Sequence, residues 1–403
     1  MIEGRDFIFT GLQPWDIAIG SNAKDIALEI SKHNRVLYIN TPLDKITYYC
    51  KKDMPEFTQR KNVVKGKSPA IRQINSSLWV LDYPFTLWPI NTLPDGMLFD
   101  AVNKLNNKKM YSFVLKTLQE LQFKDYILFI DNDIYRSFYA KEYLKPKISI
   151  YYRRDNLTSI PFWKKHIERI EPLLIKNSNL IVCNSEQLAL YARQFNPKTY
   201  DVGQGVDLSS YQIEQTKKQP EDILQIKHPI IGYIGDITSL RLDANLIYKL
   251  AVQNPHFSFV LVGKADTVFS AHALNNLKNV HFLGLKPKKQ VPNYIQSFDI
   301  CLNPQLVNDV TIGNYPRKID EFLALGKPVI ATATDTMQLF KDYVYLCHSV
   351  DDYQQAIQFA LSETDKHIIL NRIQFANTHS WKNSVEKIYQ SIQNVVKYYP
   401  NEL

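Results

Sequence analysis

Short apolar runs alternate with stretches of helical periodicity along most of this 403-residue chain. In the first half, the apolar runs that predict buried strands are residues 6–10, 35–40, 126–130, 148–152 and 179–183. Helical spacing predicts helices over residues 22–32, 97–122, 163–176 and 186–194. Residues 41–95 lack a clear period and are predicted to be irregular, with a hairpin near residues 77–81.

A polar stretch over residues 203–226 separates this pattern from a second one, which begins at residue 229. Its predicted strands are residues 229–235, 257–262, 280–282, 299–303, 328–331 and 344–346. Its predicted helices are residues 242–253 and 291–297, and a tail over 351–397 is expected to be helical throughout, with one break near Ser380. Alternation of this kind predicts an α/β protein with two doubly wound parallel sheets. We expect the loops that follow the strands (11–16, 131–136, 153–158, 235–241, 263–266 and 303–315) to face a cleft between the two domains.

Composition narrows the class of protein. The four cysteines form no CxxC pair, which favours reduced thiols in a cytoplasmic protein. No apolar run reaches the ~18 residues of a membrane span, and the first run is too short for a signal peptide.

The net charge of +8 arises in the first half of the chain and is densest over residues 45–72. Tyr48, Tyr49 and Phe57 are interleaved with the cations there, among them Lys51 and Arg60. Such a segment favours an anionic membrane surface or a phosphate-bearing acceptor, and a solvated surface loop is an equal alternative. No nucleic-acid-binding motif accompanies the charge, so we expect no nucleic-acid partner.

The most informative segment is residues 303–332, which predicts a strand end, a polar loop, a short helix, a glycine turn and a buried strand. Lys318 and Glu321 lie three residues apart and therefore share one helix face. A cation at a helix start suits a diphosphate, and a carboxylate one turn later suits ribose hydroxyls. Asn308, Asp309 and Thr311 in the loop are candidates for holding a donor sugar and its phosphate. The alternative is that Lys318 and Glu321 form an exposed ion pair.

Two other strand ends in the second half carry candidate donor residues. Gly235 and Gly263 would let a ligand approach the backbone closely, although plain turns explain them equally well. Arg241 and Lys264, each just after one of these glycines, are candidate phosphate contacts, with ordinary surface cations as the alternative.

The first half offers a candidate acceptor site. Gly11, Trp15, Asp16 and Ser21 follow the first strand, and Trp15 would stack on a sugar ring or pack at a rim. Arg154 and Asp155 follow another buried strand, and they form either an acceptor site with Asp155 in proton transfer or a structural pair. The acidic run at residues 131–133 suits a metal less well than a turn, and we predict no metal site.

The chain resembles the GT-B glycosyltransferases, in particular the retaining, family 4-like (group 1) enzymes of bacterial teichuronic acid, capsular and exopolysaccharide synthesis. Residues 14–16, 179–185, 203–207, 231–235, 280–284 and 308–332 carry the resemblance. It implies two Rossmann-like domains facing a cleft, a C-terminal helix that crosses back to the first domain, and a nucleotide diphosphate sugar donor used without an obligatory metal or cofactor. It also implies that Glu321 holds the ribose and that Lys318 is the donor-loop lysine.

Two positions depart from the family pattern. The acidic partner expected eight residues before Glu321 is replaced by Gly313, for which Asp309 is a candidate substitute. Asp236 stands where a phosphate-binding arginine is common, so Arg241 or Lys264 would supply that charge.

We therefore predict an acceptor-binding domain over residues 1–205, a nucleotide-sugar-binding domain over 206–380 and a returning helix over 381–403. The predicted function is transfer of a sugar to a cell-surface glycan or lipid-linked saccharide, by a protein in the cytoplasm or at the inner face of the cell membrane. Asp155, Lys318 and Glu321 are the predicted catalytic residues. Two alternatives remain: an inactive relative that acts as a partner in glycan assembly, and a nucleotide-sugar 2-epimerase, which the lack of an obvious catalytic histidine disfavours.

Overall fold

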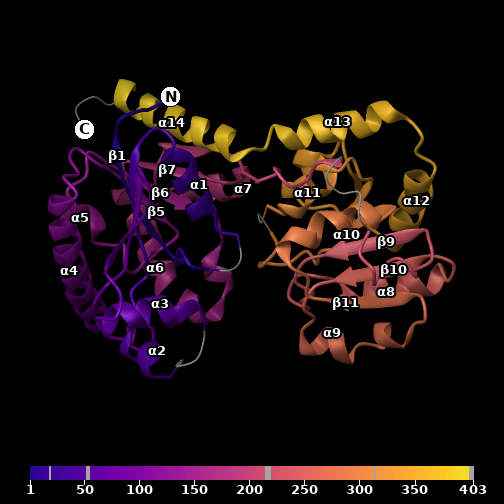
Figure 1. Cartoon of the computed structure of the whole chain (residues 1–403), viewed down its shortest axis with the longest axis horizontal. Helices are drawn as coiled ribbons and strands as arrows, with labels where there is room; N and C mark the ends of the chain where they lie inside the picture. Colours follow the sequence, from indigo (N-terminus) through magenta and orange to yellow (C-terminus); the bar gives the residue numbers. More distant parts are fainter. Residues whose placement is uncertain (18–19, 51–54, 214–218, 313–314, 399–403) are drawn as a thin grey trace. The chain divides into compact units, whose positions relative to one another are not determined.

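The computed structural model describes residues 1–17, 20–50, 55–213, 219–312 and 315–398 (Figure 1). The chain divides into two compact units. The first comprises residues 1–203 and 384–403, and the second comprises residues 204–383.

The first unit is built on a sheet of order β3-β4-β2-β1-β5-β6-β7-β8, in which only the β3–β4 pair is antiparallel within the described residues. The strands are β1 (Asp6–Gly11), β2 (Arg35–Ile39), β3 (Ile71–Asn75), β4 (Leu78–Leu81), β5 (Ile127–Asp131), β6 (Ile148–Arg153), β7 (Leu180–Cys183) and β8 (Thr199–Asp201). The helices are α1 (Asn22–Ile30), α2 (Lys45–Cys50), α3 (Pro55–Val64), α4 (Met97–Glu120), α5 (Ala140–Leu144), α6 (Pro161–Asn177) and α7 (Glu186–Arg193).

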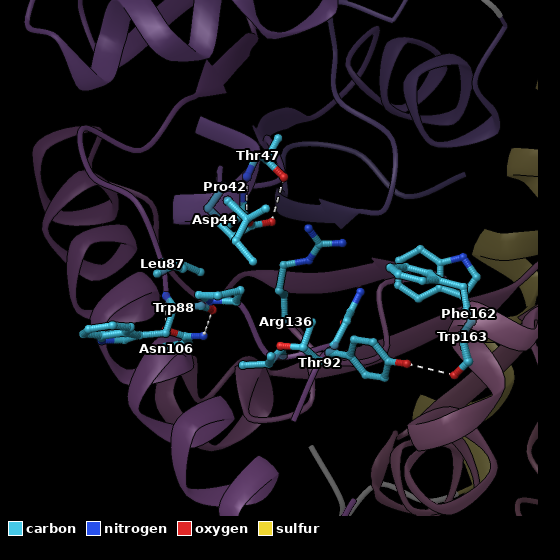
Figure 2. Close-up of a pocket in the computed structure, with 15 residues that line it drawn as sticks. Pro42, Asp44, Thr47, Leu87, Trp88, Thr92, Asn106, Arg136, Phe162 and Trp163 are labelled. Atoms are coloured by element: carbon cyan, nitrogen blue, oxygen red, sulfur yellow. Dashed lines mark hydrogen bonds between the residues drawn. The ribbon is translucent and has the colours of Figure 1, made fainter. Parts of the chain in front are cut away.

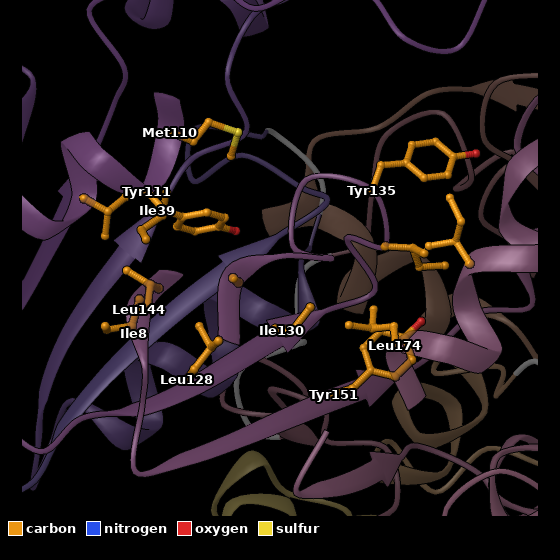
Figure 3. Packing of buried hydrophobic residues seen from close by; sticks show 14 of the residues in the cluster. Ile8, Ile39, Met110, Tyr111, Leu128, Ile130, Tyr135, Leu144, Tyr151 and Leu174 are labelled. Atoms are coloured by element: carbon orange, nitrogen blue, oxygen red, sulfur yellow. The ribbon is translucent and has the colours of Figure 1, made fainter. Parts of the chain in front are cut away.

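The core of this unit lies on both faces of the central strands, as parallel sheets covered by helices require. Every residue of β1, β5 and β6 is buried. Figure 3 shows one face, where Ile8, Leu128 and Ile130 of the sheet lie with Tyr111 of α4 and Leu174 of α6. Burial on both faces explains why these strands are continuous apolar runs in the sequence.

The prediction of an irregular segment over residues 41–95 is wrong in part. The hairpin is present as β3 and β4, but helices α2 and α3 precede it. Their apolar residues show little helical period, since α2 buries none of its residues and α3 mixes buried with exposed positions. Hydrophobic periodicity in the sequence therefore gives little indication of these two helices.

The second unit holds a parallel sheet of order β11-β10-β9-β12-β13-β14. Its strands are β9 (Ile230–Ile234), β10 (Ser258–Val262), β11 (Val280–Gly284), β12 (Ile300–Asn303), β13 (Val329–Thr332) and β14 (Tyr345–Cys347). Its helices are α8 (Ala244–Gln253), α9 (Thr267–Ala271), α10 (Val291–Ser297), α11 (Lys318–Ala324), α12 (Val350–Leu361) and α13 (Lys366–Asn377).

The tail has two breaks rather than the one predicted. Asp365 caps α13 through its side chain and interrupts the helical stretch after α12. The second break precedes α14 (Trp381–Tyr398), which returns to the first unit. There, Asn34 donates a hydrogen bond from Nδ2 to the Tyr389 hydroxyl (2.9 Å), and the Ser384 hydroxyl donates to the Val202 carbonyl (3.0 Å).

The cysteines are free, as predicted, with Cys183, Cys301 and Cys347 buried and Cys50 exposed. Among the described helices, none is both long and apolar enough to cross a membrane.

Candidate functional site

Each sheet has one point where the strand order reverses, and both points carry predicted site residues. In the first unit β1 lies between β2 and β5, and in the second β9 lies between β10 and β12. Ligands of open α/β sheets bind at such points, outside the carboxyl ends of the strands. The strand ends there are Gly11 and Asp131 in the first unit and Gly235 and Asn303 in the second.

Gly235 and Gly263 stand side by side after β9 and β10, and both require glycine. Gly263 has φ +152°, and a Cβ added there would lie 1.8 Å from the Gly235 carbonyl oxygen. Gly235 has φ +139°, and its Cβ would lie 2.8 Å from Lys318 Nζ. No L side chain fits this geometry without moving the backbone. At these two strand ends the backbone therefore carries no side chain, and the ammonium group of Lys318 lies beside it.

Lys318, at the start of α11, is half-buried and points toward the end of β9. Its ammonium donates to the Tyr233 hydroxyl (2.5 Å) and lies 4.0 Å from the centre of that ring. The Tyr233 hydroxyl in turn donates to the Asp236 carbonyl oxygen (2.9 Å). The lysine is thus held in place by a buried tyrosine and not by Glu321, so the ion-pair alternative does not describe it.

Glu321 lies one turn later on α11 and is half-buried. Burial raises the pKa of its carboxyl above the ordinary value of 4.5, while Arg317, a hydrogen bond from Tyr211 and Lys318 act in the opposite direction. A carboxylate that accepts from a tyrosine hydroxyl still has lone pairs for ligand hydroxyls.

The loop after β12 is tied to the segment after β9. Leu306 N donates to the Arg241 carbonyl oxygen (2.8 Å), and Asn308 Nδ2 donates to the Leu240 carbonyl oxygen (3.0 Å). Thr311 is buried, and its hydroxyl donates to the Leu306 carbonyl oxygen (2.5 Å). Asn308 and Thr311 therefore build the loop, and their direct contact with a donor stays a prediction.

The other predicted donor residues of the second unit are exposed. Arg241, Lys264 and Asp309 all lie at the surface of their loops, near the end of the sheet that carries Gly235 and Gly263. Asp236 is exposed as well. Gly313 lies outside the described residues. Whether any of these contacts a ligand stays a prediction.

Four residues of this site were not predicted from the sequence. Tyr233 and Tyr211 orient Lys318 and Glu321, and Asp266 accepts from Ser239 N and Oγ (2.7 and 2.8 Å), which joins two strand-end loops. Asn303 is fully buried at the end of β12, and neither its Oδ1 nor its Nδ2 has a partner among the described residues. For Tyr233, the glycines near it in the sequence were a signal that could have marked it as a site residue. The contacts of Tyr211 and Asp266 join segments far apart in the sequence, so no local pattern reveals them.

In the first unit, Asp131, Arg154 and Asp155 form a charged chain at the reversal point. Arg154 donates from Nε to Asp131 Oδ1 (2.8 Å) and from Nη1 to Asp155 Oδ2. Asp131 is buried, which raises its pKa, and its Oδ2 has no partner among the described residues. Asp155 is partly exposed, with 37% of its side-chain surface accessible. The structural pair of Arg154 and Asp155 is thus present, and a role for Asp155 in proton transfer stays a prediction.

The remaining acceptor candidates differ in how far their side chains are already occupied by contacts within the protein. Gly11 packs closely, since a Cβ there would meet Tyr38 Oη at 3.2 Å. Trp15 is buried, with an edge-on contact to Tyr38 and Lys24 Nζ over its ring. Ser21 caps α1, and Asp16 pairs with Arg72 (2.7 Å). These contacts already occupy Trp15 and Asp16, so their contact with an acceptor stays a prediction.

A pocket of about 450 Å³ lies in the first unit (Figure 2). It is formed by the loops after β2, β4 and β5, by the first turns of α2 and α6, and by Asn106 of α4. No prediction from the sequence included it. Separately, no group of three or more metal-ligating side chains occurs in the part of the chain that the structure describes.

The family model described as glycosyl transferases group 1 matches residues 228–363, the greater part of the second unit. These residues form a group 1 glycosyltransferase domain. The chain is also 34% identical over 202 residues to TuaH of Bacillus subtilis strain 168, a protein provisionally described as a teichuronic acid biosynthesis glycosyltransferase. That match covers 48% of this chain and spans half the length of the relative.

Solved structures match 97–98% of the chain and show its fold to be GT-B. Sucrose-phosphate synthase from Thermosynechococcus elongatus has a TM-score of 0.67 at 13% identity, covering 98% of this chain and 100% of that one. HepE from Anabaena, solved in complex with UDP and glucose, has a TM-score of 0.64 at 16% identity, covering 97% and 100%. Trehalose 6-phosphate synthase from Burkholderia multivorans has a TM-score of 0.64 at 8% identity, covering 98% and 99%.

Proposed function

We propose that this protein is a glycosyltransferase that moves a sugar from a nucleotide diphosphate sugar, held by the second unit, to a glycan or lipid-linked saccharide of the cell envelope. The observation that carries the proposal is the Gly235–Gly263–Lys318 arrangement inside a group 1 glycosyltransferase domain. Bare backbone with an ammonium beside it accommodates a diphosphate. The name of the B. subtilis relative and the UDP and glucose in the Anabaena structure support the donor class and the envelope acceptor.

In this proposal Lys318 stabilises the negative charge that develops on the leaving diphosphate, and Glu321 accepts hydrogen bonds from the ribose hydroxyls. Tyr233 preorganises the ammonium, so the charge contact needs no reorganisation during the reaction. Transfer with retention of configuration would then need no enzyme nucleophile, because an oxygen of the diphosphate can take the proton of the incoming hydroxyl. Asp155 orients the acceptor hydroxyl. No metal is assigned a role.

The test is the shift in melting temperature caused by UDP, GDP, ADP and their glucose conjugates. A ligand that binds only the folded state raises that temperature, by an amount that grows with concentration above Kd. We expect one nucleotide to give a shift that Glu321→Ala and Lys318→Ala abolish. Lys341→Ala, which removes an exposed lysine of the same unit, is the matched control and should leave the shift intact.

Each other outcome has a definite meaning. If no nucleotide shifts the wild-type protein, donor binding is refuted. If a nucleotide sugar binds but no sugar is ever transferred, the inactive partner in glycan assembly becomes the better description. If the bound sugar is instead recovered as its C2 epimer, the protein is an epimerase.

We further propose that this protein acts in the cytoplasm at the inner face of the membrane, with residues 45–72 against anionic lipid. Support comes from α2, which has no buried residue, and from the exposed Lys65 and Lys67 after α3. Arg60 and Lys61 are buried, and Arg60 donates to the Thr41 carbonyl and hydroxyl oxygens, so these two cations are not available to a surface as the sequence suggested. Lys51 and Lys52 lie outside the described residues.

Binding to vesicles that contain phosphatidylglycerol tests this surface. We expect binding that weakens with salt and with the pair Lys65→Gln and Lys67→Gln. Lys278→Gln with Lys341→Gln, two exposed cations of the second unit, is the control pair. If vesicle affinity changes neither with salt nor with the Lys65→Gln and Lys67→Gln substitutions, the proposal is contradicted.

A further inference from the structure

The pocket in the first unit is mainly apolar and aromatic. Trp88, Tyr135, Phe162 and Trp163 line it together with prolines and aliphatic side chains from the loops after β2 and β4. Its volume of about 450 Å³ falls within the range typical of small-molecule sites. Figure 2 shows Arg136 between the Trp88 side and the Phe162–Trp163 side of this pocket.

Several of the polar side chains in the lining are already hydrogen-bonded to the protein. Asp44 accepts from Thr47 N and Oγ1 (2.8 and 2.9 Å). Asn106 accepts from Trp88 N (3.1 Å) and donates to the Trp88 carbonyl oxygen (2.9 Å). A sugar needs several hydrogen-bonding groups around each ring, and here Asn91, Thr92 and Arg136 supply them within a lining that is otherwise mainly apolar. The pocket therefore favours an apolar occupant over a saccharide.

Two cations adjoin the apolar lining. Arg136 uses Nε for its ion pair with Asp133 (3.1 Å), while its Nη1 and Nη2 have no partner among the described residues. Lys45 Nζ lies 3.4 Å from the centre of the Trp88 ring, so it stands next to the lining. A guanidinium with two free nitrogens is the usual partner of a phosphate.

The mouth of the pocket exposes large apolar side chains. Ile46, Trp88 and Phe162 line the pocket and have 50%, 58% and 61% of their surface accessible. Ile46 belongs to α2, within the segment that we place against lipid. An apolar interior that continues into an apolar rim suits a chain that is longer than the pocket and emerges from it.

We propose that this pocket binds the lipid chain of the acceptor, an isoprenoid or acyl chain whose phosphate contacts Arg136 and Lys45. The proposal rests on the proposed function and deepens it, since it selects a lipid-linked acceptor over a free glycan. Arg136 lies in the same loop as Asp133, and that loop follows β5, which ends at Asp131.

The test is calorimetric titration of the full chain with geranyl phosphate below its micellar concentration. Geraniol, inorganic phosphate and maltose are the comparison ligands. We expect saturable binding of geranyl phosphate, weaker binding of geraniol, and none of phosphate or maltose. Binding of maltose in preference to geranyl phosphate would overturn the proposal in favour of a saccharide subsite, and absence of geranyl phosphate binding would overturn it outright.

Three variants locate the binding. Phe162→Ser and Trp88→Ala remove exposed lining residues, and each should raise Kd by roughly tenfold or more, because burial of an aromatic side chain is worth more than the ~1.4 kcal/mol of a tenfold change. Thr92→Trp adds bulk at an exposed lining position and should block binding without removing any packing. Leu105→Ser is the matched control on α4, because 63% of Leu105 is accessible and its side chain is not part of the lining.

Nucleotide-induced melting shifts of the same variants separate this inference from the proposed function. If the pocket variants lose geranyl phosphate but keep the nucleotide shift, the two sites are independent, as we propose. If Leu105→Ser weakens geranyl phosphate as much as Phe162→Ser does, the binding is nonspecific and the proposal fails. If no nucleotide shifts the melting temperature of the wild-type protein, the donor site is refuted, but the result for geranyl phosphate still stands.

Discussion

Single residues decide whether the strand ends of the second unit can accept a ligand. Gly263 and Gly284 both have positive φ, but only Gly263 has another backbone atom where a Cβ would stand. The sequence predicts both Gly235 and Gly263 as sites of close approach. What it does not reveal is that a Cβ at Gly263 would collide with the Gly235 carbonyl oxygen, because that depends on the pairing of β9 with β10.

Replacement of these glycines by alanine separates strain from crowding. Gly263→Ala should lower the free energy of unfolding by about 3 kcal/mol or more, since it adds a clash with the Gly235 carbonyl oxygen to the strained backbone. Gly284→Ala meets no atom within 4 Å and should cost about 1–2 kcal/mol through its backbone conformation alone. Urea unfolding curves of both variants measure the difference. Equal losses would show that the Gly263–Gly235 contact is not as tight as described.

The carboxyl of Glu321 gives donor binding a pH dependence. Because burial raises its pKa above 4.5, its proton returns at a higher pH than that of an ordinary glutamate. A protonated carboxyl accepts ribose hydrogen bonds poorly, so nucleotide affinity should fall as pH is lowered through this raised pKa. Titration calorimetry at several pH values tests this, with Glu321→Gln expected to lose that part of the dependence and Asp351→Asn to keep it. Identical profiles for Glu321→Gln and the wild-type protein would contradict the assignment.

At the scale of elements, the short helix α11 is fixed by α13 and the residues after it. Asp320, next to Glu321 in sequence, is fully buried and accepts from the Tyr315 hydroxyl (2.8 Å), with His379 Nδ1 2.7 Å from its other oxygen. Ile369 packs against the turn after α11, where a Cβ at Gly326 would lie 2.5 Å from it. Sequence spacing predicts α11, but it does not reveal that a histidine beyond α13 orients it.

His379→Ala should therefore destabilise the second unit. It leaves a buried carboxylate with one hydrogen bond fewer, which costs about 1–3 kcal/mol. His367→Ala, an exposed histidine at the start of α13, should cost less than about 0.5 kcal/mol. Thermal unfolding of the two variants gives the comparison. A His379→Ala protein as stable as the wild type would show that the Asp320 contact contributes nothing.

At the scale of the molecule, the alternation of apolar runs and helical segments predicts both sheets, and the resemblance to GT-B enzymes predicts the returning C-terminal helix. The strands are continuous apolar runs because helices cover both faces, and that signal is strong. Helices α2 and α3 were not predicted, nor was the pocket that α2 helps to line. Their residues are amphipathic only weakly or not at all, and the pocket brings Pro42, Trp88, Arg136 and Trp163 together from four separate segments. The spacing of residues along the sequence does not indicate that these segments come together.

The same limit applies to the candidate donor site. Lys318 and Glu321 are predicted as a pair because they lie one helical turn apart, but the tyrosines that orient them come from distant segments. The resemblance to the group 1 family predicts the fold and the domain, and the structure adds the contacts of each predicted side chain.

A crystal structure of the full chain with the nucleoside diphosphate that gives the largest melting shift tests the central claim most directly. We predict the diphosphate at Gly235 and Gly263, with an oxygen within hydrogen-bonding distance of Lys318 Nζ, and the ribose hydroxyls on Glu321. A nucleotide bound in the first unit, or bound in the second unit away from both Lys318 and Glu321, would contradict the account.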